Sequence, residues 1–304
     1  MSEEPEHTMT TSQFWANYYN EWFGFDKTIL TEILDAGETS LPRALNRYHH
    51  IVYNTTKSAS PDDKGGMNYT RTEIDYSHEE NLLPTGKPVF IATKMLGEVV
   101  PLPFYVDADG YASRYLLDVV SQNPPQAIID LGAGDGVRLF ELDMLGIDRN
   151  ISLYAAEQSK NAREIIETLC QLDPNMNISA HEFSFEKPDF SFVKERDSIL
   201  VFSFMSLMFL NTLNEDYIVE VSKMAKKVKF VHFEPFGHQF NLATNVASRE
   251  QAQAFHDKHW NMDFIGVLEK LRNAGTIKNL VLAKDVMYTK DPMTPNCILT
   301  WECS

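Results

Sequence analysis

Residues 127–136 of this chain read Ala-Ile-Ile-Asp-Leu-Gly-Ala-Gly-Asp-Gly, an apolar run followed at once by three glycines in a G-x-G-x-G spacing. A short apolar run that ends in glycines predicts a buried strand turning directly into a helix. Glycine is required in such a turn where a ligand passes close to the backbone, because a Cβ would block its approach. The stretch therefore predicts the ligand-binding edge of a parallel sheet.

Apolar strand-like runs recur through the second part of the chain and alternate with amphipathic helical segments. These runs cover residues 127–131, 152–156, 178–182, 198–202, 229–233, 280–288 and 297–303. Strands that alternate with helices form a parallel sheet covered on both faces. Turn residues instead of a helix join the last two runs, so we expect these two to pair antiparallel. The predicted fold is α/β, a seven-stranded, mostly parallel, doubly wound sheet with an antiparallel last strand.

Residues 1–120 have a different pattern and are expected to form a mainly helical cap that sets substrate specificity, with residues 121–304 forming the sheet domain. Further helices are expected at residues 27–36 and 41–53, and a loop over 58–68, where proline and glycine accumulate. Aromatic side chains crowd residues 14–25 at helical spacing. They either line an apolar substrate pocket or pack the helical layer or a homodimer interface.

Composition and charge limit the classes of partner. The 304 residues carry 27 basic and 43 acidic side chains, a net charge of −16, which repels phosphate backbones and argues against nucleic acid. The longest apolar stretch, residues 199–210, is interrupted by serines and is shorter than the roughly 20 residues of a membrane helix, so no membrane partner is expected. Cys170, Cys297 and Cys303 form no C-x-x-C pair, which predicts no metal site. Reduced thiols and an acidic N-terminus without a signal-peptide pattern predict a cytoplasmic protein.

The string at residues 130–136 resembles motif I of the class I S-adenosylmethionine-dependent methyltransferases. Dinucleotide-binding proteins favour G-x-G-x-x-G, in which the third glycine comes one position later. The resemblance implies S-adenosyl-L-methionine as the cofactor and S-adenosyl-L-homocysteine as its product. It also implies that Asp130, Gly132 and Gly134 surround the methionine part of the cofactor, while Gly136 allows close helix packing.

The resemblance continues at the ends of the next two strands. Glu157 matches the family's position that accepts hydrogen bonds from the ribose hydroxyls, and Gln158 lies beside it near the adenine. A nicotinamide-dependent dehydrogenase would place an acidic residue similarly, so Glu157 alone does not discriminate between the two cofactors. Ser184 and Phe185 match the adenine-binding exit of the third strand. They depart from the family's usual Asp, and a shifted register would give that role to residues 182–183.

The fourth and fifth strands are expected to reach the reacting groups. The resemblance implies that Ser203 and Phe204 lie near the sulfonium, where an aromatic face stabilises a cation. His232, Glu234 and His238 cluster at the end of the fifth strand, and histidine is the natural proton acceptor near neutral pH. We predict that one of these three residues positions or deprotonates the acceptor.

The resemblance thus implies a methyltransferase that modifies an oxygen or nitrogen of a small-molecule acceptor, and a peptide acceptor stays open. Two alternatives belong to other classes. One is a catalytically silent protein that keeps the fold and binds the cofactor or a partner. The other is an NAD-dependent oxidoreductase, against which the early third glycine and the final strand pair argue.

Overall fold

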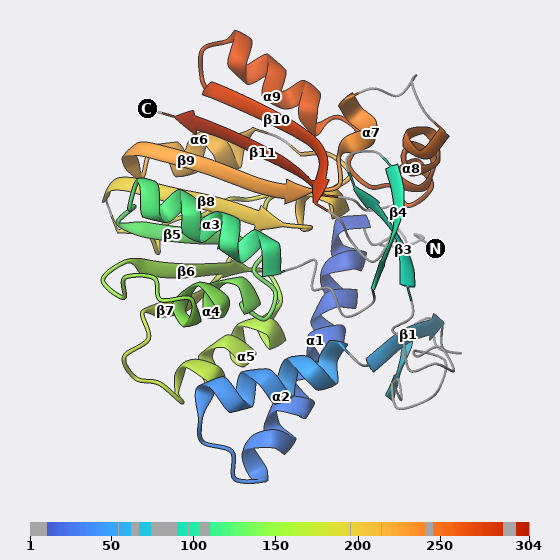
Figure 1. Ribbon diagram of the computed structural model, residues 1–304, viewed down its shortest axis with the longest axis vertical. Coiled ribbons are helices and arrows are strands. Elements are labelled where there is room, and N and C mark those ends of the chain that lie inside the picture. The colour runs from blue at the N-terminus through green and yellow to red at the C-terminus, as the bar shows by residue number, and fades with distance from the viewer. Residues whose placement is uncertain are drawn as a thin grey trace, which may run out of the picture.

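The computed structural model describes residues 11–53, 55–61, 67–73, 90–95, 98–103, 110–194, 196–213, 215–240, 246–287 and 296–303. A seven-stranded sheet lies at its centre (Figure 1). Its strands are β5 (Ala127–Leu131), β6 (Ser152–Glu157), β7 (Ile178–Glu182), β8 (Arg196–Phe204), β9 (Ala225–Glu234), β10 (Lys278–Met287) and β11 (Asn296–Cys303). The strand order is β10-β11-β9-β8-β5-β6-β7.

The pairing of the strands confirms the predicted fold class. The strands β7, β6, β5, β8 and β9 are parallel to their neighbours, and β11 runs antiparallel to both β9 and β10. The strand bounds differ from the sequence-based ones at three places that matter for the site. The first is the end of β6 at Glu157, one residue later than predicted. The strand β8 continues to Phe204 and β9 to Glu234, beyond the predicted ends at residues 202 and 233.

Helices cover both faces of the sheet, as the alternation of strands and helices predicted. Buried residues on one face pack with α1 (Thr11–Asp35), α2 (Leu41–Tyr53), α3 (Gly110–Gln122), α4 (Val137–Met144) and α5 (Lys160–Cys170). The other face packs with α6 (Asp216–Ser222), α7 (Gly237–Phe240), α8 (Val246–Asp257), α9 (Phe264–Asn273) and the 3-10 turn η2 (Leu207–Phe209). Successive residues of a strand point to opposite faces, so Ile128 joins the first core and Ile129 the second.

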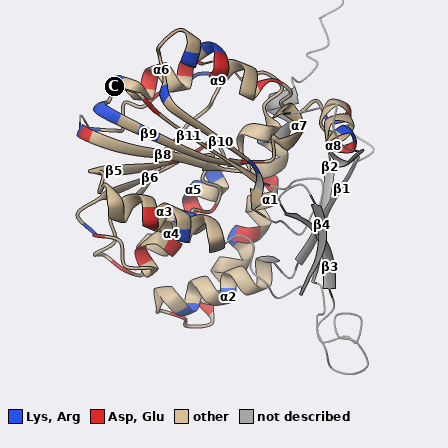
Figure 2. Ribbon diagram, turned by 45° about the horizontal axis from the view of Figure 1, so that its top comes forward, with Lys and Arg blue, Asp and Glu red and all other residues tan. Residues whose placement is uncertain are grey.

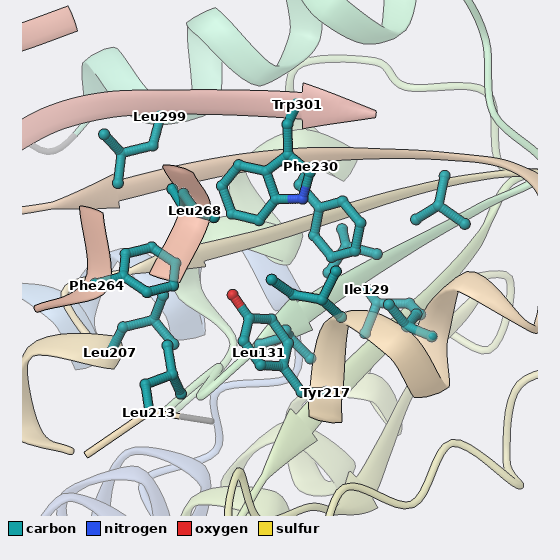
Figure 3. Packing of buried hydrophobic residues seen from close by; sticks show 14 of the residues in the cluster. Ile129, Leu131, Leu207, Leu213, Tyr217, Phe230, Phe264, Leu268, Leu299 and Trp301 are labelled. Carbon is teal, nitrogen blue, oxygen red and sulfur yellow. The ribbon is translucent and has the colours of Figure 1, made fainter. Parts of the chain in front are cut away.

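Aromatic side chains dominate the second core. Figure 3 shows Trp301 of β11 and Phe230 of β9 near Tyr217 of α6, with Phe264 of α9 to one side. The rings of Phe230 and Trp301 stack with their centroids 4.9 Å apart. Burying a large apolar side chain contributes roughly 1.5–3 kcal/mol. This core fixes the positions of β9 and β11 relative to each other, and with them the loops that follow β8 and β9.

The N-terminal region combines helices with strand pairs. The helix α1 runs past the carboxyl ends of the sheet strands and packs against α2 and α5 (Figure 1). The chain then forms two antiparallel pairs, β1 (Thr55–Pro61) with β2 (Met67–Glu73) and β3 (Phe90–Met95) with β4 (Glu98–Pro103). The loop predicted over residues 58–68 is thus partly strand. The turn chemistry of residues 62–66 lies outside the described residues, and the polar sequences on either side hid the strands.

The charged residues of the visible face are mixed. In the view of Figure 2, Lys and Arg are interspersed with Asp and Glu along the helices that flank the sheet. A search of the described helices found none whose length and apolar character would let it cross a bilayer.

Gly136, the N-cap of α4, lies close against Ile166 of α5. Its φ is +77°, and a Cβ there would lie 2.9 Å from Ile166 Cγ1, so we expect Gly136→Ala to lower the free energy of unfolding. Backbone strain and overpacking together predict a loss of roughly 2–4 kcal/mol in urea unfolding. Gly146 is the matched control, because its φ is +88° but no described atom lies within 4 Å of its Cβ position. Equal losses in the two alanine variants would show that packing against Ile166 is unimportant.

Candidate functional site

A cavity of about 230 Å³ lies at the carboxyl edge of the sheet, where ligands bind in open parallel sheets. It is bounded by the glycine loop after β5, by the segments that follow β6, β7 and β8, and by α1. The lining residues are Tyr19, Phe23, Gly132, Gly134, Glu157, Gln158, Ser159, Phe183, Ser184, Phe185, Glu186, Met205, Ser206, Phe209 and Leu210. Six of the nine predicted cofactor-binding residues are among them: Gly132, Gly134, Glu157, Gln158, Ser184 and Phe185.

The floor of the cavity is a turn whose backbone conformation favours glycine. Gly132 and Gly134 have φ values of +70° and +56°, in the left-handed region. A Cβ on Gly132 would lie 2.6 Å from Ser206 Cβ, and one on Gly134 would lie 3.2 Å from Phe23 Cζ. The Gly132 N–H donates to the carbonyl of Ala156 over 2.8 Å, which ties the turn to β6. The bare backbone therefore reaches the cavity without obstruction.

Glu157 presents a buried carboxylate to the cavity. Only 8% of the residue is exposed, and burial raises the pKa of the carboxyl, opposed by the hydrogen bonds that it accepts. The Gly134 N–H donates to Oε2 over 2.9 Å and the Ser159 N–H donates to Oε1 over 2.7 Å. A carboxylate oxygen accepts more than one hydrogen bond, so both oxygens can also bind ligand hydroxyls. The backbone thus orients Glu157 without using up its acceptor capacity.

The residues after β7 form one wall. Ser184 accepts a hydrogen bond from the Glu186 N–H over 3.2 Å, and Phe185 meets Phe183 edge-on with ring centroids 5.0 Å apart. Phe185 Cε2 lies 3.8 Å from the position of a Cβ on Gly132, so this ring stands next to the glycine turn. Phe183, from the alternative register, also lines the cavity, whereas Glu182 does not.

The helix α1 covers the cavity with Tyr19 and Phe23. It is held to the start of α5 by Asn20, whose Oδ1 accepts from Ser159 Oγ over 3.1 Å and from the Asn161 N–H over 3.3 Å. Burial raises the pKa of the Tyr19 phenol, and its ring packs on Phe209 with centroids 5.1 Å apart. The aromatic residues 14–25 were expected either to line a substrate pocket or to pack the helical layer or a dimer interface, and two of them, Tyr19 and Phe23, line the cavity. The helical spacing of these aromatic residues is the signal that identified the helix.

Ser203 and Phe204, which were expected near the sulfonium, are not among the residues that line the cavity. Because β8 continues to Phe204, Met205 and Ser206 take the places beside the glycine turn. Phe204 instead packs on Phe233, and the Arg138 guanidinium lies 4.4 Å from its ring centroid. Ser203 interrupts the apolar run before the strand ends at Phe204, so no local pattern marks that end.

Asp130 lies within β5 and is also absent from the cavity lining. The residue is 2% exposed. Burial raises the pKa of its carboxyl well above the ordinary range, and the charge of Arg138 opposes that rise. The structure therefore places Asp130 below the glycine turn as a buried neighbour of Arg138, rather than in contact with the cavity.

His232, Glu234 and His238 are all fully buried and none of them lines the cavity. Alternation along β9 turns His232 and Glu234 to the same face of the sheet, which is the face of the aromatic core. The His232 ring lies 4.8 Å from that of Trp301, and burial lowers its pKa to about 3. His238 packs against Phe255 with ring centroids 4.5 Å apart. Their placement does not support the predicted contact with an acceptor.

Glu234 is instead the centre of a buried hydrogen-bond cluster. Its Oε1 accepts from Ser203 Oγ over 2.7 Å and from the N–H groups of Ser206 and Leu207 over 3.1 Å each. Burial raises the pKa of the carboxyl to about 7, against the lowering effect of these donors.

In the part of the chain that the structure describes, no three His, Cys, Asp or Glu side chains are grouped as metal ligands.

Comparison with known proteins gives only distant likenesses. The chain matches no model of a protein family, and no curated protein matches its sequence. The methyltransferase domain of bacterial CtHen1-C aligns over 65% of this chain and 100% of that chain, with 14% identity and a TM-score of 0.43. A candidate O-methyltransferase of Nostoc punctiforme PCC 73102 aligns over 64% and 56%, with 12% identity and a TM-score of 0.46.

A third solved structure is the plantazolicin methyltransferase BamL in complex with a triazolic desmethylPZN analog and SAH. It aligns over 65% of this chain and 84% of that chain, with 12% identity and a TM-score of 0.41. At these identities and TM-scores the likenesses support no particular cofactor or acceptor.

The raised pKa of Glu234 predicts a pH-dependent stability. Its folded-state pKa of about 7 exceeds the ordinary 4.5, so its contribution is fully present below pH 4.5 and is lost as the pH rises through 7. Over that window wild type should lose about 3 kcal/mol relative to Glu234→Gln, which has no proton to lose. Urea unfolding across the same pH range measures this difference. Glu186→Gln, at an exposed carboxyl, should retain the wild-type profile, and parallel profiles for wild type and Glu234→Gln would contradict the assignment.

Proposed function

We propose that this chain is an S-adenosyl-L-methionine-dependent methyltransferase that transfers a methyl group to an oxygen or nitrogen of a small-molecule acceptor. The observation that carries the proposal is the combination of Gly132, Gly134 and Glu157 around one cavity. A turn without Cβ atoms and an oriented, buried carboxylate lie together at the ligand-binding edge of a parallel sheet. S-adenosyl-L-homocysteine is the product that such an enzyme releases.

The residues present fit this cofactor. Glu157 offers two carboxylate oxygens to the two ribose hydroxyls, and its hydrogen bonds from Gly134 and Ser159 hold it in place. The glycine turn leaves room for the methionine part, where a Cβ would project toward Ser206 or Phe23. Phe185 provides a flat apolar face beside that turn. These features support the cofactor by chemistry rather than by likeness to other proteins.

Two features favour this cofactor over a nicotinamide dinucleotide. The glycine spacing is that of the methyltransferase motif, with Gly136 packed against Ile166 of α5 as the sequence analysis expected. The strand β11 lies between β9 and β10 and runs antiparallel to both, which is also the family's pattern. The acidic residue at the end of β6 would suit either cofactor and does not contribute to the choice.

The cofactor, when bound, supplies a methyl group already activated on a positively charged sulfur. What the chain must add is alignment, which contributes roughly 7–11 kcal/mol in well-oriented reactions. Tyr19, Phe23 and Phe209 cover the cavity and limit the access of water. Aromatic faces also attract a cation, and the net charge of −16 is compatible with a positively charged ligand.

A small molecule is the acceptor that suits the site. The cavity is covered by α1, and its lining is largely aromatic and aliphatic. The negative surplus of the chain repels the phosphates of a nucleic acid. A screen of metabolites and short peptides for cofactor-dependent gains of one methyl mass tests the acceptor. We expect gains on oxygen or nitrogen of small molecules, and gains on peptides alone would overturn this part of the proposal.

Substitution of Glu157 tests the cofactor. Losing the two hydrogen bonds to a charged acceptor should weaken S-adenosyl-L-homocysteine binding about 100-fold in Glu157→Ala and at least about 10-fold in Glu157→Gln. Isothermal titration calorimetry measures both affinities. Glu186→Gln is the matched control, since Glu186 also lines the cavity but is exposed, and it should stay within about threefold of wild type. Tight binding of NAD with no binding of S-adenosyl-L-homocysteine would point to the oxidoreductase instead.

A further inference from the structure

We infer that Glu234 is a positioning residue. Its buried carboxylate holds residues 205–207 in place, keeps Met205 and Ser206 as a wall of the cavity, and so supports cofactor binding through Ser206. As far as it concerns the cofactor, this inference rests on the proposed function. The claim about the wall does not, because it concerns the ligand-free chain. Glu234 itself lies outside the cavity lining, so its effect has to pass through other residues.

The first step is the convergence of donors on a single oxygen. Oε1 of Glu234 accepts hydrogen bonds from Ser203 Oγ over 2.7 Å and from the N–H groups of Ser206 and Leu207 over 3.1 Å each. Two consecutive backbone N–H groups thus end on the same acceptor. A buried carboxylate persists only where hydrogen bonds compensate for its burial. The segment after β8 and the carboxylate therefore hold each other.

The second step carries this restraint to the cavity. Ser206 Oγ donates to the carbonyl of Leu131 over 2.8 Å, at the last residue of β5. Its Cβ lies 2.6 Å from where a Cβ on Gly132 would be. Ser206 is therefore in contact with the glycine turn and is tied to Glu234 through its own N–H. A displacement of Ser206 would change the shape of the cavity where the methionine part of the cofactor is proposed to lie.

The third step is the backbone of Met205, which lines the cavity next to Ser206. Its φ is +51°, a left-handed conformation that a residue with a Cβ rarely adopts. Such a conformation persists only when the surrounding structure imposes it. The Met205 N–H donates to the backbone carbonyl of Phe233 in β9 over 2.9 Å, and Glu234 is the residue after Phe233. The end of β9 thus restrains both Met205 and Ser206.

Ser203 and His232 complete the cluster behind Glu234. Ser203 has one hydroxyl proton and donates it to Glu234. Ser203 Oγ also lies 2.6 Å from His232 Nδ1, so the hydroxyl joins the imidazole to the Glu234 carboxyl. His232 and Tyr217 are the titratable groups that face Glu234 from β9 and α6. Among the described residues the Tyr217 hydroxyl has no hydrogen-bond partner, which makes Tyr217 suitable as a control.

Amide hydrogen exchange of the ligand-free protein tests the wall. In Glu234→Ala, and in Glu234→Asp with its shorter reach, we expect exchange at Ser206 and Leu207 to rise at least about 10-fold. Glu234→Gln retains a carbonyl oxygen at Oε1 and should keep the protection. Tyr217→Phe removes a buried hydroxyl nearby and should leave these two amides unchanged. The exchange rate at Ile129 in β5 reports general destabilisation. Dividing the rates at Ser206 and Leu207 by the rate at Ile129 corrects for it.

Calorimetry with S-adenosyl-L-homocysteine tests the consequence for the cofactor. We expect Glu234→Ala or Glu234→Asp to weaken binding about 10-fold, with recovery in Glu234→Gln and no change in Tyr217→Phe. The double variant Ser206→Ala/Glu234→Ala should lose less binding free energy than the sum of the losses in the two single variants, because Glu234 acts on the cofactor through Ser206.

The outcomes separate the two claims. If wild type does not bind S-adenosyl-L-homocysteine, the proposed function fails, while the exchange data still decide whether Glu234 holds the wall. Unchanged exchange at Ser206 and Leu207 in Glu234→Asp overturns the inference even if Glu234→Ala does not fold. Equal effects of Tyr217→Phe and Glu234→Ala, or wild-type affinity in both Glu234→Ala and Glu234→Asp, would overturn it as well.

Discussion

The backbone of Gly132 and Gly134 turns through positive φ at the end of β5, and the geometry of the site follows from this turn. The turn brings the chain close to Ser206 and Phe23. A Cβ on Gly132 would clash with Ser206, and one on Gly134 would make a tight contact with Phe23. The turn also aims the Gly134 N–H at Glu157, so that one backbone conformation shapes the floor of the cavity and orients its carboxylate. A side chain at either glycine would disturb both functions at once.

Two carboxylates with similar burial have different tasks in this arrangement. Glu157 accepts backbone hydrogen bonds at the edge of the cavity and keeps acceptor capacity for a ligand. Glu234 accepts them inside the core and keeps the segment after β8 in place. The distinction comes from strand position, since Glu157 ends β6 next to the glycine turn while Glu234 faces the aromatic core of β9 and β11.

Sequence patterns predicted the sheet well because its inner strands, such as β5 and β6, are buried almost throughout and read as apolar runs. They ended the fourth strand two residues early. The end of β8 is set by pairing with β9, through Ser203 with His232 and Phe204 with Phe233, which no local pattern encodes. They assigned chemistry to His232 because alternation gives a face of a strand but does not say whether that face meets a cavity or a core. The polar strands β1 and β2 escaped detection for the opposite reason, a lack of apolar residues.

A crystal structure grown with S-adenosyl-L-homocysteine tests the account most directly. The account predicts that the ligand occupies the cavity, with its ribose hydroxyls within hydrogen-bonding distance of Glu157 and its amino-acid part over Gly132 and Gly134. A ligand bound elsewhere, or bound in the cavity without contact to Glu157 and the glycine turn, would contradict it.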